Sequence, residues 1–174
     1  KLGYRLPHAD LVAAYAIYIP TGAFEAGGGG GVSRGHWTHQ ISAGGAGFVD
    51  AARRWRTSAL ASYEINSRKR GIDITRGDTV RIEGGAGARV LGVLELGVAA
   101  YALWQVRDDG GAELPPALRG ARERVYGVGP EIGVVVPQLR ARITLRAMWD
   151  LAAESRPEGR VLVAQIAALA LAPR

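Results

Sequence analysis

The feature that most constrains this chain is a two-residue alternation of apolar and polar side chains that persists for ten residues or more. In segment 55–66, Trp55, Tyr63 and Ile65 belong to one set, while Arg56 and Glu64 belong to the other. Successive side chains of a strand point to opposite faces, so this period predicts strands with one apolar and one polar face. Strands of globular proteins average about five or six residues, whereas a tilted strand needs about 9–11 residues to cross a bilayer. Period and length together therefore favour transmembrane strands.

The same alternation, with some less regular segments that are apolar on both faces or rich in glycine, extends over most of the chain. Eight strands are predicted, at about 10–20, 36–48, 54–67, 78–90, 93–107, 123–136, 140–154 and 160–171. Long connections at 21–35, 68–77 and 108–122, and a shorter one at 155–159, alternate with tight ones at 49–53, 91–92 and 137–139. Up-and-down outer-membrane barrels combine long extracellular loops with short periplasmic turns in this way. We therefore expect an all-β, antiparallel up-and-down transmembrane β-barrel domain over residues 1–174.

Composition excludes several other classes of protein. The mean hydropathy is only +0.03, and no segment reaches the roughly 18 uncharged apolar residues of a spanning helix. The chain has no cysteine, which rules out disulfides, thiolate metal sites and cysteine nucleophiles. Its net charge is +6, but the arginines are spread singly along the sequence, so no basic stripe for nucleic acid is formed. We expect no nucleic-acid partner.

Alternation alone does not decide which face points inward. A soluble barrel buries its apolar set, whereas an outer-membrane barrel turns that set toward lipid and the polar set toward the lumen. Tryptophans near strand ends favour the second arrangement, because the amphipathic indole ring suits a membrane interface. The predicted interface aromatics are Trp55, Trp104 and Trp149.

Glycines in the polar set also favour the outer-membrane arrangement, because they relieve crowding on an inner wall where strands curve. They are Gly85, Gly87, Gly97, Gly127, Gly129 and Gly133. The alternative is a soluble ligand-binding β-barrel with the opposite facing. It predicts that Trp55, Trp104 and Val106 are buried and that Arg56, Glu83 and Arg146 are exposed.

The charged residues of the polar faces are the candidate functional residues. In the barrel they point into one lumen, where they either pair into a closed, structural interior or line a polar pathway that sets selectivity. Nothing in the sequence marks a nucleophile or a general base, so we expect no catalytic residue and no enzyme. The candidate lumen residues are Arg56, Glu64, Arg81, Glu83, Glu95, Arg142, Arg146 and Asp150.

Metal and cofactor sites are not predicted. His36 and His39 stand three residues apart, which places them on opposite faces of a strand. The segment 108–111 (DDGG) resembles the start of a calcium loop but lacks the later ligands, and Asp and Gly favour turns by themselves. The glycine run at 27–31 is interpreted as a flexible loop.

Six short segments, in order along the chain, resemble the outer-membrane protein family associated with the meta-pathway of phenol degradation. They are YIPTG (18–22), GHWT (35–38), YEIN (63–66), TRGD (75–78), residues 97–110 and VGPE (128–131). The resemblance implies a barrel in the bacterial outer membrane that transports small hydrophobic or aromatic compounds. Its implied partners are the lipid bilayer, the outer-membrane assembly machinery and such a substrate. Family members have further N-terminal strands, so we also expect this chain to be a fragment of a barrel of about twelve strands.

Overall fold

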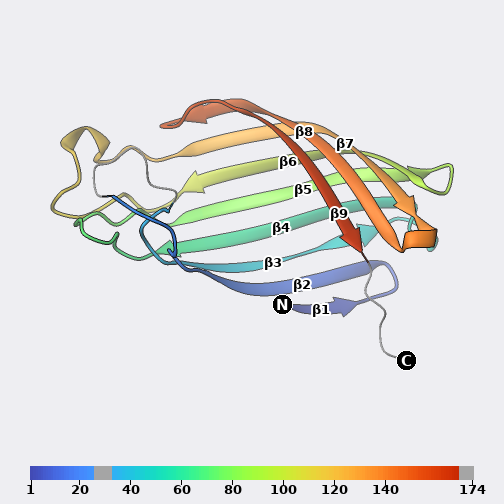
Figure 1. Ribbon diagram of the computed structural model, residues 1–174. Helices are drawn as coiled ribbons and strands as arrows, with labels where there is room; N and C mark the ends of the chain where they lie inside the picture. Colours follow the sequence, from blue (N-terminus) through green and yellow to red (C-terminus); the bar gives the residue numbers. More distant parts are fainter. Residues whose placement is uncertain (26–32, 169–174) are drawn as a thin grey trace.

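The structure is a computed structural model that describes residues 1–25 and 33–168. Within these residues, nine strands form one antiparallel sheet in which each strand pairs with its neighbours in the sequence (Figure 1). The strands are β1 (Leu2–Arg5), β2 (Ala9–Tyr18), β3 (Thr38–Phe48), β4 (Trp55–Asn66), β5 (Thr79–Val90), β6 (Leu94–Gln105), β7 (Arg124–Val136), β8 (Ala141–Glu154) and β9 (Arg160–Ala168). The predicted all-β, up-and-down antiparallel architecture is confirmed.

The sequence-based count of eight strands was one too low. Leu2–Arg5 forms β1, which pairs with the first half of β2 through a turn that contains Pro7. Four residues are too few to show a period of two, and for this reason the strand was missed. The other eight strands coincide with the predicted ones. The glycine run at 27–31 and the last three residues of the final predicted strand lie outside the described residues.

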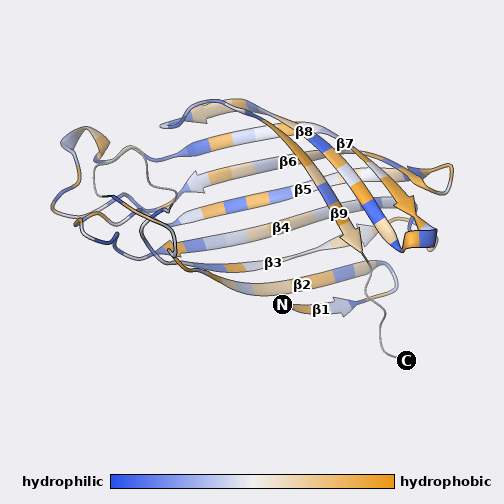
Figure 2. Cartoon of the chain, viewed as in Figure 1, coloured by the Kyte–Doolittle hydropathy of each residue, from blue (hydrophilic) through white to orange (hydrophobic). Residues whose placement is uncertain are grey.

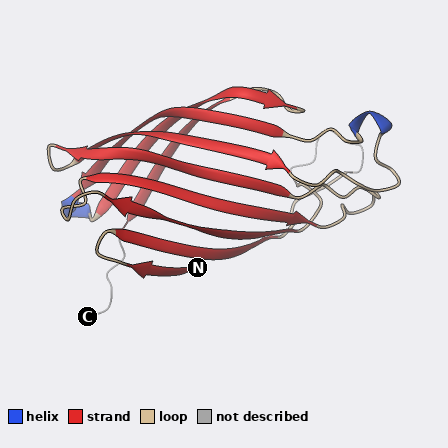
Figure 3. Cartoon of the chain, turned by 180° about the vertical axis from the view of Figure 1, so that it is seen from behind, coloured by secondary structure: helices blue, strands red, loops and turns tan. Residues whose placement is uncertain are grey.

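The connections are segregated by length, as expected. The described residues of the segments before β3, β5, β7 and β9 lie at one end of the sheet, which we call the long-loop end, and the tighter turns lie at the other (Figure 1). Two 3-10 helices, Pro116–Leu118 and Pro137–Leu139, occupy opposite ends (Figure 3). Between β5 and β6, Leu91 and Gly92 adopt φ angles of 50° and 75°. Positive φ at both positions matches the twist of tight hairpins.

The apolar set of each strand faces outward. Hydrophilic and hydrophobic residues alternate along the strands (Figure 2). The large apolar side chains of the outer face are solvent-exposed, including Ile41, Trp55, Val98, Leu145 and Leu162. The soluble-barrel alternative predicts that Trp55 and Val106 are buried, but they are 60% and 43% exposed. For these two residues, that prediction was wrong.

The polar set is turned to the concave, inner face and is the better buried one. Thr38, Ser42, Ser62 and Asn66 are all buried there, on β3 and β4. Thr38 Oγ1 donates to Asn66 Oδ1 at 2.7 Å, and the Ser42 and Ser62 hydroxyls lie 2.9 Å apart. These bonds satisfy polar groups that would otherwise be costly to bury. The sheet is therefore inside out relative to a soluble protein, with polar residues inside and apolar residues outside.

The sheet curls strongly without closing. Within residues 1–25 and 33–168, β1 and β9 have no pairing with each other, so both remain edge strands. Among the same residues, the helices are too short to cross a membrane. What the fold provides is a curved wall whose inner face gathers side chains from strands that are distant in sequence.

Candidate functional site

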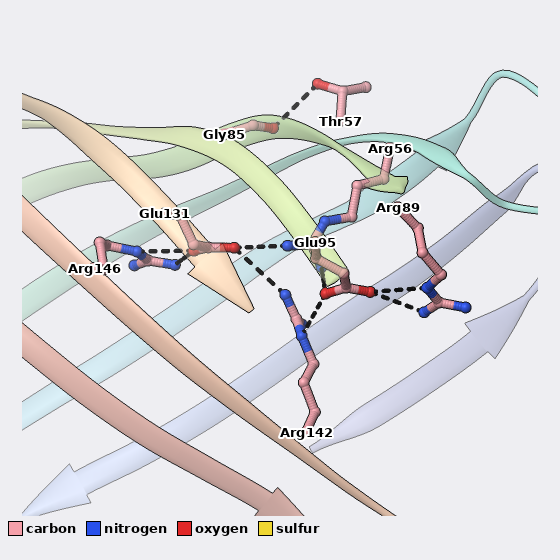
Figure 4. Close-up of polar contacts among 8 residues, drawn as sticks. All are labelled: Arg56, Thr57, Gly85, Arg89, Glu95, Glu131, Arg142 and Arg146. Carbon is pink, nitrogen blue, oxygen red and sulfur yellow. Dashed lines mark hydrogen bonds and ion pairs between the residues drawn. The ribbon is translucent and has the colours of Figure 1, made fainter. Parts of the chain in front are cut away.

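An ion-pair cluster joins several strands on the inner face (Figure 4), and it lies toward the short-turn end, where β4 begins and β5 ends. We call it the arginine–glutamate cluster, and its members are Arg56, Arg89, Glu95, Glu131, Arg142 and Arg146. Four guanidinium groups surround two carboxylates. The members come from β4, β5, β6, β7 and β8, so the cluster ties five strands together across the wall.

Each carboxylate of the cluster contacts three arginines. Glu131 Oε1 lies 2.6 Å from Arg56 Nη2 and 3.4 Å from Arg142 Nη2, and its Oε2 accepts from Arg146 Nε at 2.9 Å. Glu95 lies 2.8 Å from Arg89 Nη2, 2.7 Å from Arg142 Nε and 3.7 Å from Arg56 Nη1. The side chain of Glu95 is only 8% exposed and that of Glu131 only 11%. Buried charge is tolerated only when it is paired in this way.

Two glycines allow Arg56 on β4 to reach Glu131 on β7, three strands away. The strand register aligns Arg56, Gly87, Gly97, Glu131 and Arg146 in one row across β4 to β8. Because the two positions between Arg56 and Glu131 have no side chain, the guanidinium reaches across them. A Cβ built on Gly97 would lie 2.7 Å from the Ala86 carbonyl oxygen, closer than real contacts. The glycines expected on an inner wall therefore keep the strands close and the row clear.

A second row crosses the same strands nearer the long-loop end. It aligns Glu83, Tyr101, Gly127 and Asp150. The Tyr101 ring packs over Gly127, and its hydroxyl donates to the Asp150 carboxylate. Asp150 also accepts from the backbone N–H of Gly159 at 2.8 Å, which ties the β8–β9 connection to the wall.

Between and beside these rows, the inner wall also carries apolar side chains. We call Leu60, Ala99, Leu103, Val125 and Met148 the inner apolar patch. Ala99, Val125 and Met148 are 3%, 1% and 6% exposed. Met148 stands two residues after Arg146 on β8, a separation of about 6.6 Å along a strand. The patch thus begins directly beside the arginine–glutamate cluster.

All eight predicted lumen residues lie on the inner face, but they do not form one group. Arg56, Glu95, Arg142 and Arg146 meet in the cluster, and Asp150 belongs to the Tyr101 row. Arg81 and Glu83 pair along β5 at 3.3 Å. Glu64 lies toward the long-loop end, where it accepts from Thr79 Oγ1 at 3.4 Å.

Sequence reasoning missed two members of the cluster. Glu131 is the residue that three arginines share, and Arg89 completes the contacts of Glu95. Both occupy inner positions of the two-residue alternation, which was the signal that could have found them. Their partnership with residues on other strands depends on register, which the pattern of one strand does not show.

The outer face carries aromatic side chains near both ends. Trp55 begins β4 at the short-turn end, and Trp104 lies near the long-loop end of β6. Trp149 is the ninth of the 14 residues of β8 and lies near the middle of the wall, so its predicted place near a strand end was wrong. Tyr63 and Trp104 share one row through Val80. Tyr63 donates to Asp78 at 2.9 Å, and Trp104 Nε1 donates to the Tyr126 hydroxyl at 2.9 Å.

His36 and Asp50 are among the titratable groups outside the strands whose pKa values are shifted. Burial lowers the pKa of His36 in the connection before β3, where its Nδ1 lies 2.9 Å from the Arg34 carbonyl. In the turn before β4, the backbone N–H of Trp55 and the side chain of Arg54 donate to Asp50, which lowers the pKa of that carboxyl. In residues 1–25 and 33–168, no three His, Asp or Glu side chains are grouped to hold a metal ion.

Fold and site together define the class: an up-and-down antiparallel β-wall with an apolar outer face and a charged inner face. A family model described as "Putative MetA-pathway of phenol degradation" matches residues 1–166, and the chain belongs to this family. The family predicted from the six short segments is thereby confirmed. A search of curated proteins and a search of solved structures gave no match.

Proposed function

We propose that this chain forms the wall of a bacterial outer-membrane β-barrel that lets small hydrophobic or aromatic compounds pass, without catalysing a reaction. The inverted facing of the sheet carries the proposal. Exposed apolar side chains on every long strand suit lipid, and hydrogen-bonded polar ones suit a lumen. On β4, Trp55 and Tyr63 are eight residues apart, about 26 Å along a strand. At a tilt of about 40°, this length covers about 20 Å of the roughly 25 Å apolar band of such barrels.

The partners that this proposal implies are the lipid bilayer and the outer-membrane assembly machinery. The family's link to phenol degradation supports an aromatic substrate. The inner cavity has a volume of about 820 Å³, within the range of about 300–1,000 Å³ that is usual for small-molecule sites.

Labelling of two adjacent positions tests the facing. Ser58 and Ala59 are both small and exposed, and they lie on the inner and outer faces of β4. The chain has no cysteine of its own, so Ser58→Cys and Ala59→Cys each introduce a single thiol. In protein refolded into liposomes, we expect a water-soluble maleimide to label only Ser58→Cys and a bilayer-confined reagent to label only Ala59→Cys. Equal labelling of both by the water-soluble reagent would refute the membrane proposal.

A second candidate function is a structural barrel with a closed interior. The observation that favours it is the arginine–glutamate cluster, which bridges five strands and reduces the open space of the wall. Liposome swelling separates the two candidates. Swelling in benzyl alcohol or another small neutral aromatic that is faster than in protein-free liposomes supports passage. Protein that is correctly inserted by the labelling test but gives no faster swelling supports a closed interior.

A further inference from the structure

The cavity on the inner face joins two chemically different surfaces. It is bordered on one side by Arg56, Arg142 and Arg146 of the cluster, and on the other by Leu103 and Met148 of the inner apolar patch. A purely apolar substrate would use only the second surface. The first surface is the feature of the cavity that the proposed function does not explain.

Charge around the cavity is unbalanced. Five arginines line it against three carboxylates, a surplus of two positive charges: Arg56, Arg81, Arg142, Arg146 and Arg156 against Asp10, Glu83 and Glu131. Asp10 is already paired with Arg53, a residue of the turn, at 2.8 Å. Glu131 is shared by three guanidinium groups, and Glu95, which does not line the cavity, contacts Arg142 and Arg56. Each guanidinium offers five N–H donors, so the wall retains donors that its own carboxylates do not occupy.

We infer that this cavity is a subsite for small organic anions with an aromatic or apolar body, such as aromatic carboxylates. The carboxylate pairs with Arg146 and Arg56, and the ring lies on Met148 and Leu103. Guanidinium–carboxylate pairing in a partly desolvated cavity is strong, and it adds to the burial of the ring. The inference rests on the proposed function and narrows its substrate class.

Three probes distinguish the contribution of the arginines to binding from that of the inner apolar patch: benzoate, benzyl alcohol and acetate. In refolded protein in detergent, titration calorimetry should show that benzoate binds about tenfold more tightly than benzyl alcohol, the gain of one charge-assisted contact. Acetate, which has the charge without the ring, should bind more weakly than benzoate. Benzyl alcohol binding as tightly as benzoate would overturn the inference.

Substitutions assign the effect to the cluster. Arg146→Gln should remove most of the preference for benzoate, and Glu131→Gln, which frees guanidinium charge, should increase it. The opposite signs matter, because a folding defect would weaken binding in both variants. Arg122→Gln is the matched control: Arg122 pairs with Asp108 at 2.7 Å in a connection at the long-loop end, away from the cavity. A benzoate preference that survives Arg146→Gln unchanged would also overturn the inference.

Flux measurements keep this inference separate from the proposed function. After subtraction of the flux across protein-free liposomes, equal passage of benzoate and benzyl alcohol leaves the proposed function intact and overturns the subsite. Selective benzoate binding in detergent without any flux supports the subsite and refutes passage.

Discussion

The two faces of the sheet belong to the same strands, yet one exposes apolar side chains and the other buries polar and charged ones. The outer face exposes Ile41, Val98 and Leu145. The inner face buries Glu95, Thr144 and Gln105 and satisfies its charges through the arginine–glutamate cluster. The outer face therefore depends on its surroundings for stability, while the inner face depends on pairing between strands. This difference between the two faces is the observation on which the proposed lipid surroundings rest.

The largest difference between the two faces is expected when an arginine is introduced at two adjacent positions, one on each face. Ala59 lies midway between Trp55 and Tyr63 on the outer face, so Ala59→Arg would place a guanidinium at the centre of the bilayer. We expect it to lower the free energy of unfolding by about 2–4 kcal/mol. Ser58→Arg, on the inner face, should cost about 1 kcal/mol or less. Urea unfolding in lipid vesicles measures both, and equal losses would contradict the assignment of faces.

Adding one methyl group should also distinguish the faces. Gly97→Ala forces its Cβ against the Ala86 carbonyl oxygen on the neighbouring strand, and we expect a loss of about 1–3 kcal/mol. On the outer face, a Cβ at Gly47 meets only Thr57 Cγ2 at 3.6 Å, an ordinary contact. Gly47→Ala should be neutral or stabilise by about 0.5 kcal/mol, because alanine loses less chain entropy on folding. Equal destabilisation in the same unfolding assay would mean that the inner row is not tightly packed.

A smaller effect is expected at the outer aromatics. Trp104 packs edge-on against Tyr126, with ring centroids 5.8 Å apart, and donates to its hydroxyl. Trp104→Leu keeps the apolar surface but removes the ring and the N–H donor, and should cost about 1 kcal/mol. The exposed outer residue Leu96, changed to Val, serves as the control. A Trp104→Leu variant as stable as that control would show that the aromatic pair contributes nothing specific.

The smallest expected effect on stability concerns Asp50, in the turn that joins β3 to β4. Asp50 accepts from the backbone N–H groups of Arg54 and Trp55 at 2.8 and 3.0 Å, so its pKa in the folded state lies below the ordinary 3.8. The stabilisation is complete above that value and is lost as the pH falls through the lowered pKa. The difference in stability between Asp50→Asn and the unchanged protein should therefore shrink at acidic pH. A difference that is independent of pH would contradict this role.

The sequence predicted those features that depend on a single strand and its connections. Period and length placed eight strands, the loop lengths gave the two ends, and each of the eight candidate lumen residues lies on the inner face. Leu2–Arg5 was missed because four residues show no period, and Glu131 and Arg89 were missed because their importance lies in neighbours on other strands.

By itself, the sequence determined the strands and the division of their side chains into two sets, because that division follows from the geometry of each strand. Only the tertiary structure decided which set faces inward, since both facings are compatible with the same alternation. It also decided that Arg56, Gly87, Gly97, Glu131 and Arg146 share one row. Register is a relation between strands, and a shift by one residue would move each side chain to the other face.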